Sequence, residues 1–390
     1  MSDDRRLPGV VDRDGERRVR VMAGLELSRG RAALALLGVA LLFAVPDLTP
    51  LLPGVKLLVV HQGLLFGFAA VGLNLLLRHT RLVSFGHAAF FGAGAYATAV
   101  LATHYEVAGL FTLLATALVA AAVVATVVGY LSLRHTGLYF ALLTLAFGQL
   151  LFAIAQGQQF LGGSDGLSVR PGPGRGGAPT ILGQVFAPEV YELLVYYLTV
   201  VVVLVGLLVM YRLANSPIGN ALDAIGQDRT RAQFIGIPTR RYVWAAFVIS
   251  GVYGGIAGGL YGVAVKHVRP EATLHFLRSG EILFMAILGG FQTLLGPLIG
   301  GVVFFFLKIG GRNFTDYFDA LTGVVLLLVV FGFPRGIVGS LGGDRTVRAR
   351  AAAVRSDPTV VLEWAVAGVG RLGGALRTAA RNVRSVFGGT

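Results

Sequence analysis

The sequence predicts an all-α fold, a polytopic bundle of transmembrane helices, and three observations point to it. Of the 390 residues, 55% are hydrophobic and only 14% are charged, whereas about a quarter of the residues are charged in a typical soluble domain. The apolar residues gather in runs of about 17 to 25, the length that a helix needs to cross a bilayer. Gly accounts for 55 residues, and small residues allow membrane helices to pack closely.

The apolar runs give about ten helices that cross or nearly cross the membrane, within a range of eight to ten. The expected segments are 32–52, 57–77, 82–103, 108–133, 136–156, 190–214, 241–264, 280–290, 292–308 and 317–334. The eighth is too short to cross alone at about 1.5 Å per residue. Gly289 and Gly290, with Gly296 and Pro297 just beyond, predict a broken or re-entrant pair that neighbouring helices bury.

The distribution of Lys and Arg predicts the orientation, because short cytoplasmic loops carry an excess of these residues. With the N-terminus inside, 25 of the 33 Lys and Arg fall in inner segments and 8 in outer ones. We therefore expect an N-in and C-in, multi-pass protein of the plasma (inner) membrane. The formal charge of +13 is then mainly a signal of orientation, and no nucleic-acid partner is expected.

These helices form one membrane domain over residues 32–340, with three segments outside the membrane. Residues 1–31 carry eight Arg and form a cytoplasmic basic arm. Residues 156–189 are rich in Gly and form an extracytoplasmic loop. Residues 341–390 form a cytoplasmic basic tail, in which apolar residues and arginines fall on different faces of a helix that suits the inner leaflet.

A fourth segment, the cytoplasmic residues 216–237, has its own helix signals. Ser216 is a good N-cap, Pro217 suits the first helical position, and Gly236 is placed to end a second helical stretch. Apolar residues with helical spacing form a stripe: Ile218, Ala221, Leu222 and Ile225. The stripe either packs on the chain's own helices, lies on the lipid surface, or docks on a partner, and spacing alone leaves these alternatives open.

Residues for chemistry are scarce. None of the three Lys is followed by Ser or Thr, so the chain has no P-loop for ATP. The seven His have no close metal-binding spacing, and there is no Cys. We therefore expect no enzyme activity, no metal and no cofactor on this chain.

A few polar residues lie inside the apolar runs. At membrane depth such groups either cross-link helices or line a pathway, and the sequence leaves both roles open. The candidates for a translocation pathway are Asn74, Ser84, His87, Gln149 and Glu281.

Two segments rich in small residues, 84–96 and 250–261, are weakly alike. An inverted repeat, as found in secondary transporters, would account for this likeness. A self-contained secondary transporter of a small polar metabolite, and a structural membrane scaffold, therefore stand as alternatives to a subunit of a larger transporter.

Seven motifs, spread in order from about 57 to 340, carry a resemblance to a known family. They are GLNLLL at 72–77, LVSFGHAAFFGAGAY at 82–96, GLYFALLTLAFG at 137–148, GGSDGL at 162–167, SPIGNALDAI at 216–225, LGGFQTLLGP at 288–297 and FPRGI at 333–337. Together they resemble the permease subunit, of the M type, of the branched-chain amino acid ABC importers.

This resemblance implies a type II importer-like bundle whose energy comes from other chains. The implied partners are a second, H-type permease subunit, two ABC ATPase subunits and an extracytoplasmic substrate-binding protein. The implied substrate is a branched-chain or related amino acid, with urea or short amides as the alternative. It also implies ATPase-coupling roles for Pro217, Gly219, Ala221, Leu222, Ile225, Ala232 and Gly236.

The chain departs from the family within this coupling segment. Asn220, Asp223, Gly226 and Gln227 stand where members of the family mostly carry charged residues, often Arg. The resemblance therefore implies docking through shape more than through salt bridges.

Overall fold

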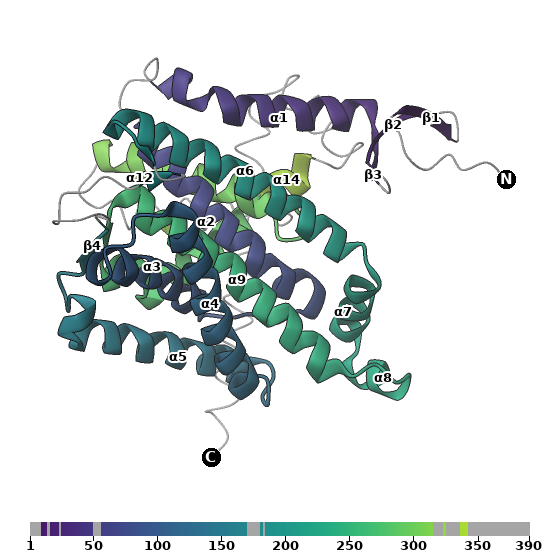
Figure 1. The fold of residues 1–390 in the computed structure, drawn as a ribbon. Coiled ribbons are helices and arrows are strands. Elements are labelled where there is room, and N and C mark those ends of the chain that lie inside the picture. Colours follow the sequence, from purple (N-terminus) through teal and green to yellow (C-terminus); the bar gives the residue numbers. More distant parts are fainter. Residues whose placement is uncertain are drawn as a thin grey trace. The chain divides into compact units, whose positions relative to one another are not determined.

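The computed structural model describes residues 9–13, 16–22, 25–49, 56–169, 180–181, 184–314, 323–324 and 336–341. The chain divides into two compact units, Met1–Leu57 and Leu58–Thr390, and Figure 1 shows their elements. Most of the expected tenth helix, 317–334, and the whole tail 342–390 lie outside the described residues.

The first unit contains one helix and a small sheet. Strands β1 (Gly9–Arg13), β2 (Glu16–Met22) and β3 (Leu25–Ser28) pair antiparallel in the order β1-β2-β3, and α1 (Arg29–Leu48) follows. The strands are a departure from the all-α prediction and from the simple basic arm at 1–31. Two features of the local sequence favour these strands. Arg and Val alternate in β2, as in a strand with two different faces, and the Asp14-Gly15 pair before it favours a hairpin turn.

The second unit is built from helices. They are α2 (Leu57–Leu75) with a π-helical continuation, η2 (Leu76–Thr80), α3 (His87–His104), α4 (Leu110–Ser132), α5 (Leu138–Gly157), α6 (Pro188–Ala214), α7 (Pro217–Gln227), α8 (Arg229–Phe234), α9 (Thr239–Val265), α10 (Pro270–Thr273), α11 (Phe276–Gly289), α12 (Gly296–Phe314) and α14 (Gly336–Leu341). Within the described residues, six helices are long and apolar enough to cross a membrane. The prediction of a polytopic helical membrane protein is confirmed.

Short elements fill the extracytoplasmic loop expected at 156–189. They are the 3-10 turn η3 (Gln159–Leu161) and strands β4 (Leu167–Ser168), β5 (Thr180–Ile181) and β6 (Gln184–Val185). Strand β4 pairs with β7 (His267–Val268), which directly follows α9. The turn between η3 and β4 uses Gly162 and Gly166, both with positive φ.

The break expected near Gly289 is confirmed. Helix α11 ends at Gly289, and Gly290 follows with φ of 107°, a conformation that residues with a Cβ rarely adopt. Thr293 closes the turn, since its hydroxyl donates to the Gly290 carbonyl and accepts from Gly296 N–H. Helix α12 then packs back against α11.

Among the helices that the structure describes in the second unit, α9 has its most extensive packing with two neighbours, α3 and α4. Every fourth residue on one face of α4 is small: Ala117, Ala121, Ala125 and Gly129. Facing them in reverse order along α9 are Gly259, Gly255, Gly251 and Phe247. The two helices therefore run antiparallel with their backbones close together.

A second glycine face of α9 lies against α3. A Cβ added to Gly258 would overlap the carbonyl oxygen of Phe91, and one added to Gly94 would overlap that of Gly255. Gly254 and Gly262 approach Phe90 and Ala95 in the same order along the chain, so α3 and α9 run parallel. With α4 on one face and α3 on the other, α9 lies at the centre of the packing.

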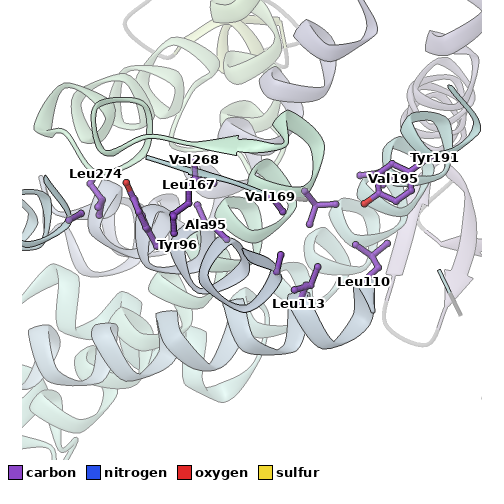
Figure 2. Close-up of a cluster of buried hydrophobic side chains, with 14 residues drawn as sticks. Ala95, Tyr96, Leu110, Leu113, Leu167, Val169, Tyr191, Val195, Val268 and Leu274 are labelled. Carbon is purple, nitrogen blue, oxygen red and sulfur yellow. The ribbon is translucent and has the colours of Figure 1, made fainter. Parts of the chain in front are cut away.

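A hydrophobic cluster closes the end of the second unit near β4 and β7. Figure 2 shows side chains from several elements meeting there, among them Tyr96 of α3, Leu113 of α4 and Val268 of β7. Leu167 of β4 and Val195 of α6 complete the contact. The loop strands are thereby fixed to the helices.

The seam between α3 and α9 gives a direct test. In Gly258→Ala the new methyl group would overlap backbone of α3 that cannot turn aside, so we expect the free energy of unfolding in detergent to fall by about 1–3 kcal/mol. Gly280→Ala is the control, because it lies within α11 with nothing within 4 Å of its added Cβ. This change should be neutral or stabilising by up to about 1 kcal/mol. Thermal unfolding of both variants measures the difference, and equal stability would contradict the close packing.

Candidate functional site

The coupling segment predicted at 216–237 forms two short helices, each specified by its own cap. The Ser216 hydroxyl accepts from Gly219 N–H at 3.4 Å, as expected for an N-cap, and Pro217 begins α7. Asp228 caps α8, since its carboxylate accepts from the N–H groups of Thr230 and Arg231 at 3.0 and 3.1 Å. Gly236 follows with φ of 86°.

Helix α7 packs its apolar stripe on its own chain. Leu222 is fully buried and Ile225 nearly so, and α7 contacts η2, α6 and α9. A Cβ at Gly219 would overlap the carbonyl of Ala214 at the end of α6. Two of the four stripe residues are thus buried against the chain itself, without any partner.

The seven predicted coupling residues divide accordingly. Gly219, Leu222, Ile225 and Ala232 are buried, Ala221 is half-buried, and Pro217 and Gly236 are exposed. Their role in contact with an ATPase stays a prediction. In this chain the buried members hold α7 and α8 in place, and other residues form the free surface.

Two large apolar side chains of that free surface were missed by the sequence reasoning. Phe234 at the end of α8 is 86% exposed, and Ile235 after it is 74% exposed; Ile218 at the start of α7 is 43% exposed. The sequence does contain a signal for this surface, because Phe234 and Ile235 are adjacent large apolar residues in a mainly polar segment. Exposed apolar groups on a loop between membrane helices indicate a contact surface.

Positive charge gathers at the same end of the second unit. The guanidinium groups of Arg134, after α4, and Arg240, in α9, lie 5.5 and 5.3 Å from the ring centroid of Tyr130. Arg78 lies in η2, which contacts α7. Figure 1 shows α7 and α8 at this end, with β4 at the other. The end thus combines exposed apolar groups with basic ones.

The N-terminus of α3 lies inside the bundle and carries two of the predicted pathway residues. Ser84 is buried, and its hydroxyl accepts from Gly86 N–H. The free N–H of Ala88 donates to Ser279 of α11 at 2.9 Å, and Phe85 N–H donates to Thr144 of α5 at 3.2 Å. Two other helices, α11 and α5, and the neighbouring Ser84 thus supply acceptors for the backbone N–H groups at and just before the start of α3.

His87 joins three helices at this point. The Ser250 hydroxyl donates to the Gly72 carbonyl at 2.6 Å, so it accepts from His87 Nε2–H at 2.7 Å. The other ring nitrogen, Nδ1, is buried without a hydrogen-bond partner. In this chain His87 links α3 to α9 and α2.

Asn74 and Gln149 do not take part in the hydrogen bonds that join His87, Ser250 and Gly72. Asn74 donates from Nδ2 to the Thr293 carbonyl at 3.0 Å and so ties α2 to the turn between α11 and α12. Gln149 lies in α5, one residue after Gly148, which approaches Gly86. The Asn74 Oδ1 and Gln149 Nε2 atoms are buried without partners.

Glu281 forms a separate, partly buried ion cluster. Its carboxylate accepts from Arg278 at 2.6 Å and from Lys308 of α12 at 2.9 Å. All three side chains are at most a quarter exposed. The cluster carries one net positive charge and fastens α11 to α12. Four of the five candidate residues, all except Gln149, thus have a hydrogen-bond partner within the chain, and the described residues do not show a pathway.

Metal binding has no support among the described residues, which contain no group of three His, Cys, Asp or Glu side chains that could hold an ion.

Comparisons with known proteins agree on one family. The family model described as "Branched-chain amino acid transport system / permease component" matches residues 57–330. The permease LivM of the high-affinity branched-chain amino acid transport system of Escherichia coli K12 is 28% identical over 283 residues, which cover 69% of this chain. The match spans just under two thirds, 66%, of LivM's own length.

Two further relatives extend this picture. The LivH permease of the same E. coli system is 24% identical over 296 residues, covering 72% of this chain and 93% of LivH. The guanosine ABC transporter permease NupP of Bacillus subtilis is 24% identical over 154 residues, covering 37% of this chain and 44% of NupP. No solved structure matches the chain.

The ion cluster at Glu281 gives a stability test. Glu281→Gln keeps the volume and removes the charge, leaving two partly buried cations without their anion, so the free energy of unfolding should fall by about 1–3 kcal/mol. Glu192→Gln is the matched control, because its pair with Lys266 is more exposed and should contribute about 1 kcal/mol or less. Thermal unfolding in detergent compares the two variants. Equal losses of stability would show that the Glu281 cluster contributes no more than an exposed ion pair.

Proposed function

The chain belongs to the family of branched-chain amino acid transport permeases, and we propose that it is the M-type permease subunit of an ATP-binding cassette importer. The family match over residues 57–330 carries this proposal. Together with six helices able to cross a membrane among the described residues, it makes the chain a multi-pass inner-membrane protein. We propose that the chain is a transport component and that partner subunits hydrolyse ATP.

The proposed complex has three further subunits, one permease and two ATPases, and an extracytoplasmic binding protein that delivers the substrate to it. A second permease of the H type would complete the pathway, and two ABC ATPases would bind the cytoplasmic side. LivM and LivH are both named as permeases of one transport system, which supports a pair of unlike permeases. An extracytoplasmic binding protein would deliver the substrate, and no cofactor is proposed on this chain.

The proposed cargo is leucine, isoleucine, valine or a related amino acid. The names of LivM and LivH support it. The guanosine permease NupP matches a smaller part of the chain, yet it shows that resemblance within the family extends across chemically different cargoes. Urea and short amides are therefore included among the substrates to be assayed.

The orientation we propose puts both termini and the α7–α8 pair in the cytoplasm. The arginines near α7, among them Arg78, Arg134 and Arg240, support this side. The proposed domain plan keeps a cytoplasmic arm at 1–31, a membrane domain at 32–340 with about ten helices, an outer loop at 156–189 and a cytoplasmic tail at 341–390.

The proposed mechanism uses α7 and α8 as the element on which the ATPases push. The exposed surface would be the contact, and the buried Leu222 and Ile225 would pass the displacement to α6, η2 and α9. The pathway residues proposed from the sequence, Asn74, Ser84, His87, Gln149 and Glu281, would line or support the route that opens.

Reconstitution tests the function as a whole. The complete set of subunits in proteoliposomes should accumulate radiolabelled leucine only when ATP is inside with the ATPases and the binding protein is on the opposite side. Unlabelled valine, guanosine, urea and acetamide serve as competitors to define the cargo. Accumulation by the chain alone on an ion gradient would instead support a secondary transporter.

The contact surface can be tested at Phe234. We expect Phe234→Ser to weaken ATPase binding by about thirtyfold or more, since a central aromatic contact is commonly worth about 2 kcal/mol or more, and less ATPase should therefore co-purify with the permease. Because Phe234 is almost fully exposed, the change should leave the folding of the permease intact, and size-exclusion chromatography checks this.

Tyr105→Ser is the matched control, because this aromatic residue is also exposed, at the turn between α3 and α4 on the proposed outer side. It should leave ATPase recovery unchanged. Full ATPase recovery with Phe234→Ser would remove Phe234 from the interface.

A further inference from the structure

Helix α7 is joined to the end of α2 by a short hydrogen bond between two titratable side chains. His79 Nδ1 lies 2.7 Å from Asp223 Oδ1. A carboxylate only accepts hydrogen bonds, so the imidazole donates. The His79 side chain is 5% exposed and that of Asp223 is 47% exposed. The bond therefore has one buried partner, the histidine at the end of α2, and one half-exposed partner on α7.

The same two elements also touch through their backbones. A Cβ added to Gly226 would overlap the carbonyl oxygen of His79 and come within 3.4 Å of the Thr80 Cα. Gly226 therefore lets the last turn of α7 rest directly on η2. At its other end α7 rests on α6, where Gly219 meets the Ala214 carbonyl. The helix is fastened at both ends.

The point of attachment on α2 is irregular. Residues 76–80 form a π-helical turn, and Arg81 after it has φ of 54°. The Thr80 hydroxyl donates to the Leu76 carbonyl at 2.8 Å within this turn. Single π-helical turns are frequent at functional positions of helices.

From this turn α2 leads directly to the break between α11 and α12. Asn74 lies five residues before His79 on the same helix and donates to the Thr293 carbonyl. The sequence of contacts from Asp223 to His79, along α2 to Asn74, and on to Thr293 joins the cytoplasmic helix pair to the broken helix pair.

We propose that His79 and Asp223 are positioning residues that make the end of α2 move with α7, so that displacement of the coupling helix reaches the α11–α12 turn. The inference rests on the proposed function, because it assigns how an ATPase-driven movement enters this permease. It also gives two residues that depart from the family pattern a contact within the chain: the Asp223 carboxylate pairs with His79, and Gly226 lies against the His79 carbonyl.

Transport measured per ATP hydrolysed tests the inference. In the complete reconstituted transporter, Asp223→Ala should lower the leucine moved per ATP by about tenfold, a change in the range expected for losing a hydrogen bond to a charged group. Recovery of the ATPases should stay at the wild-type level. Asp223→Asn keeps the volume and an acceptor oxygen, so it should restore most of the ratio.

A double variant tests whether His79 and Asp223 act through the same interaction or independently. His79→Leu with Asp223→Ala should be no worse than the more affected single variant, because both remove the same interaction. An unchanged ratio in Asp223→Ala, or one that falls to the same extent in Asp223→Asn, would overturn the inference. Additive losses in the double variant would overturn it as well.

A distance measurement addresses the movement itself. The chain has no Cys, so spin labels can be placed on Arg78→Cys and Gln227→Cys alone, at exposed positions beside the bond. The distance between them should stay constant between the nucleotide-free and ATP-bound complex, and should broaden or change in the Asp223→Ala background. A distance that changes with nucleotide while Asp223 is present would contradict joint movement.

Failure of the inference can be told apart from failure of the proposed function. Suppose that the wild-type complex accumulates leucine with ATP and that the Asp223 variants move as much leucine per ATP as the wild type. The inference then fails, and the proposed function stands. If the wild-type chain neither binds ATPases nor transports with ATP, the proposed function fails, and the inference fails with it.

Discussion

The close approach of α9 to α3 and α4 is the constraint on which the rest of the second unit depends. In a membrane, helices gain little from hiding apolar surface, so association depends on close van der Waals contact. Glycines on two faces of α9 permit that contact on both sides at once: the Phe91 carbonyl of α3 lies against Gly258, and alanine side chains of α4 lie against Gly251, Gly255 and Gly259. A methyl group added at Gly258 or Gly255 would overlap atoms of the neighbouring helix, so the two helices would have to move apart there.

The buried polar groups follow from this arrangement. Packing α3 along α9 brings the start of α3 inside the bundle, where its free N–H groups would be costly without acceptors. Ser279 and Thr144 supply acceptors from α11 and α5, and Ser250 links His87 to the Gly72 carbonyl. The polar residues near α3 therefore have a structural role in this chain.

Sequence patterns predicted those features that depend on neighbouring residues. The expected helix at 108–133 is found at 110–132, the N-cap at Ser216 is present, and the helix break falls at Gly290. Features that need a partner from elsewhere in the chain were not predictable. Lys308 reaches Glu281 from the next helix, and Asp223 is held by a histidine 144 positions earlier.

The strands at 9–28 were missed for a related reason, since charged residues dominated the interpretation of that segment although Arg and Val alternate in β2. The apolar stripe on α7 shows another limit of prediction from sequence. Its spacing correctly predicted an amphipathic helix, but spacing does not say which surface covers the apolar face. The structure covers Leu222 and Ile225 from within and leaves Phe234 and Ile235 free.

A coupling element must hold firmly to its own subunit and still offer a surface to another, and α7 and α8 meet these needs with different residues. Glycines at both ends of α7 and the bond from Asp223 to His79 secure the inner side, whereas the exposed apolar pair lies beyond them on α8 and after it. These contacts are short, and two of them are between backbone atoms. A force on the exposed pair would therefore move α7 and its own helices together. Rigid attachment of this kind is what a subunit without its own P-loop would need to receive work from a separate ATPase.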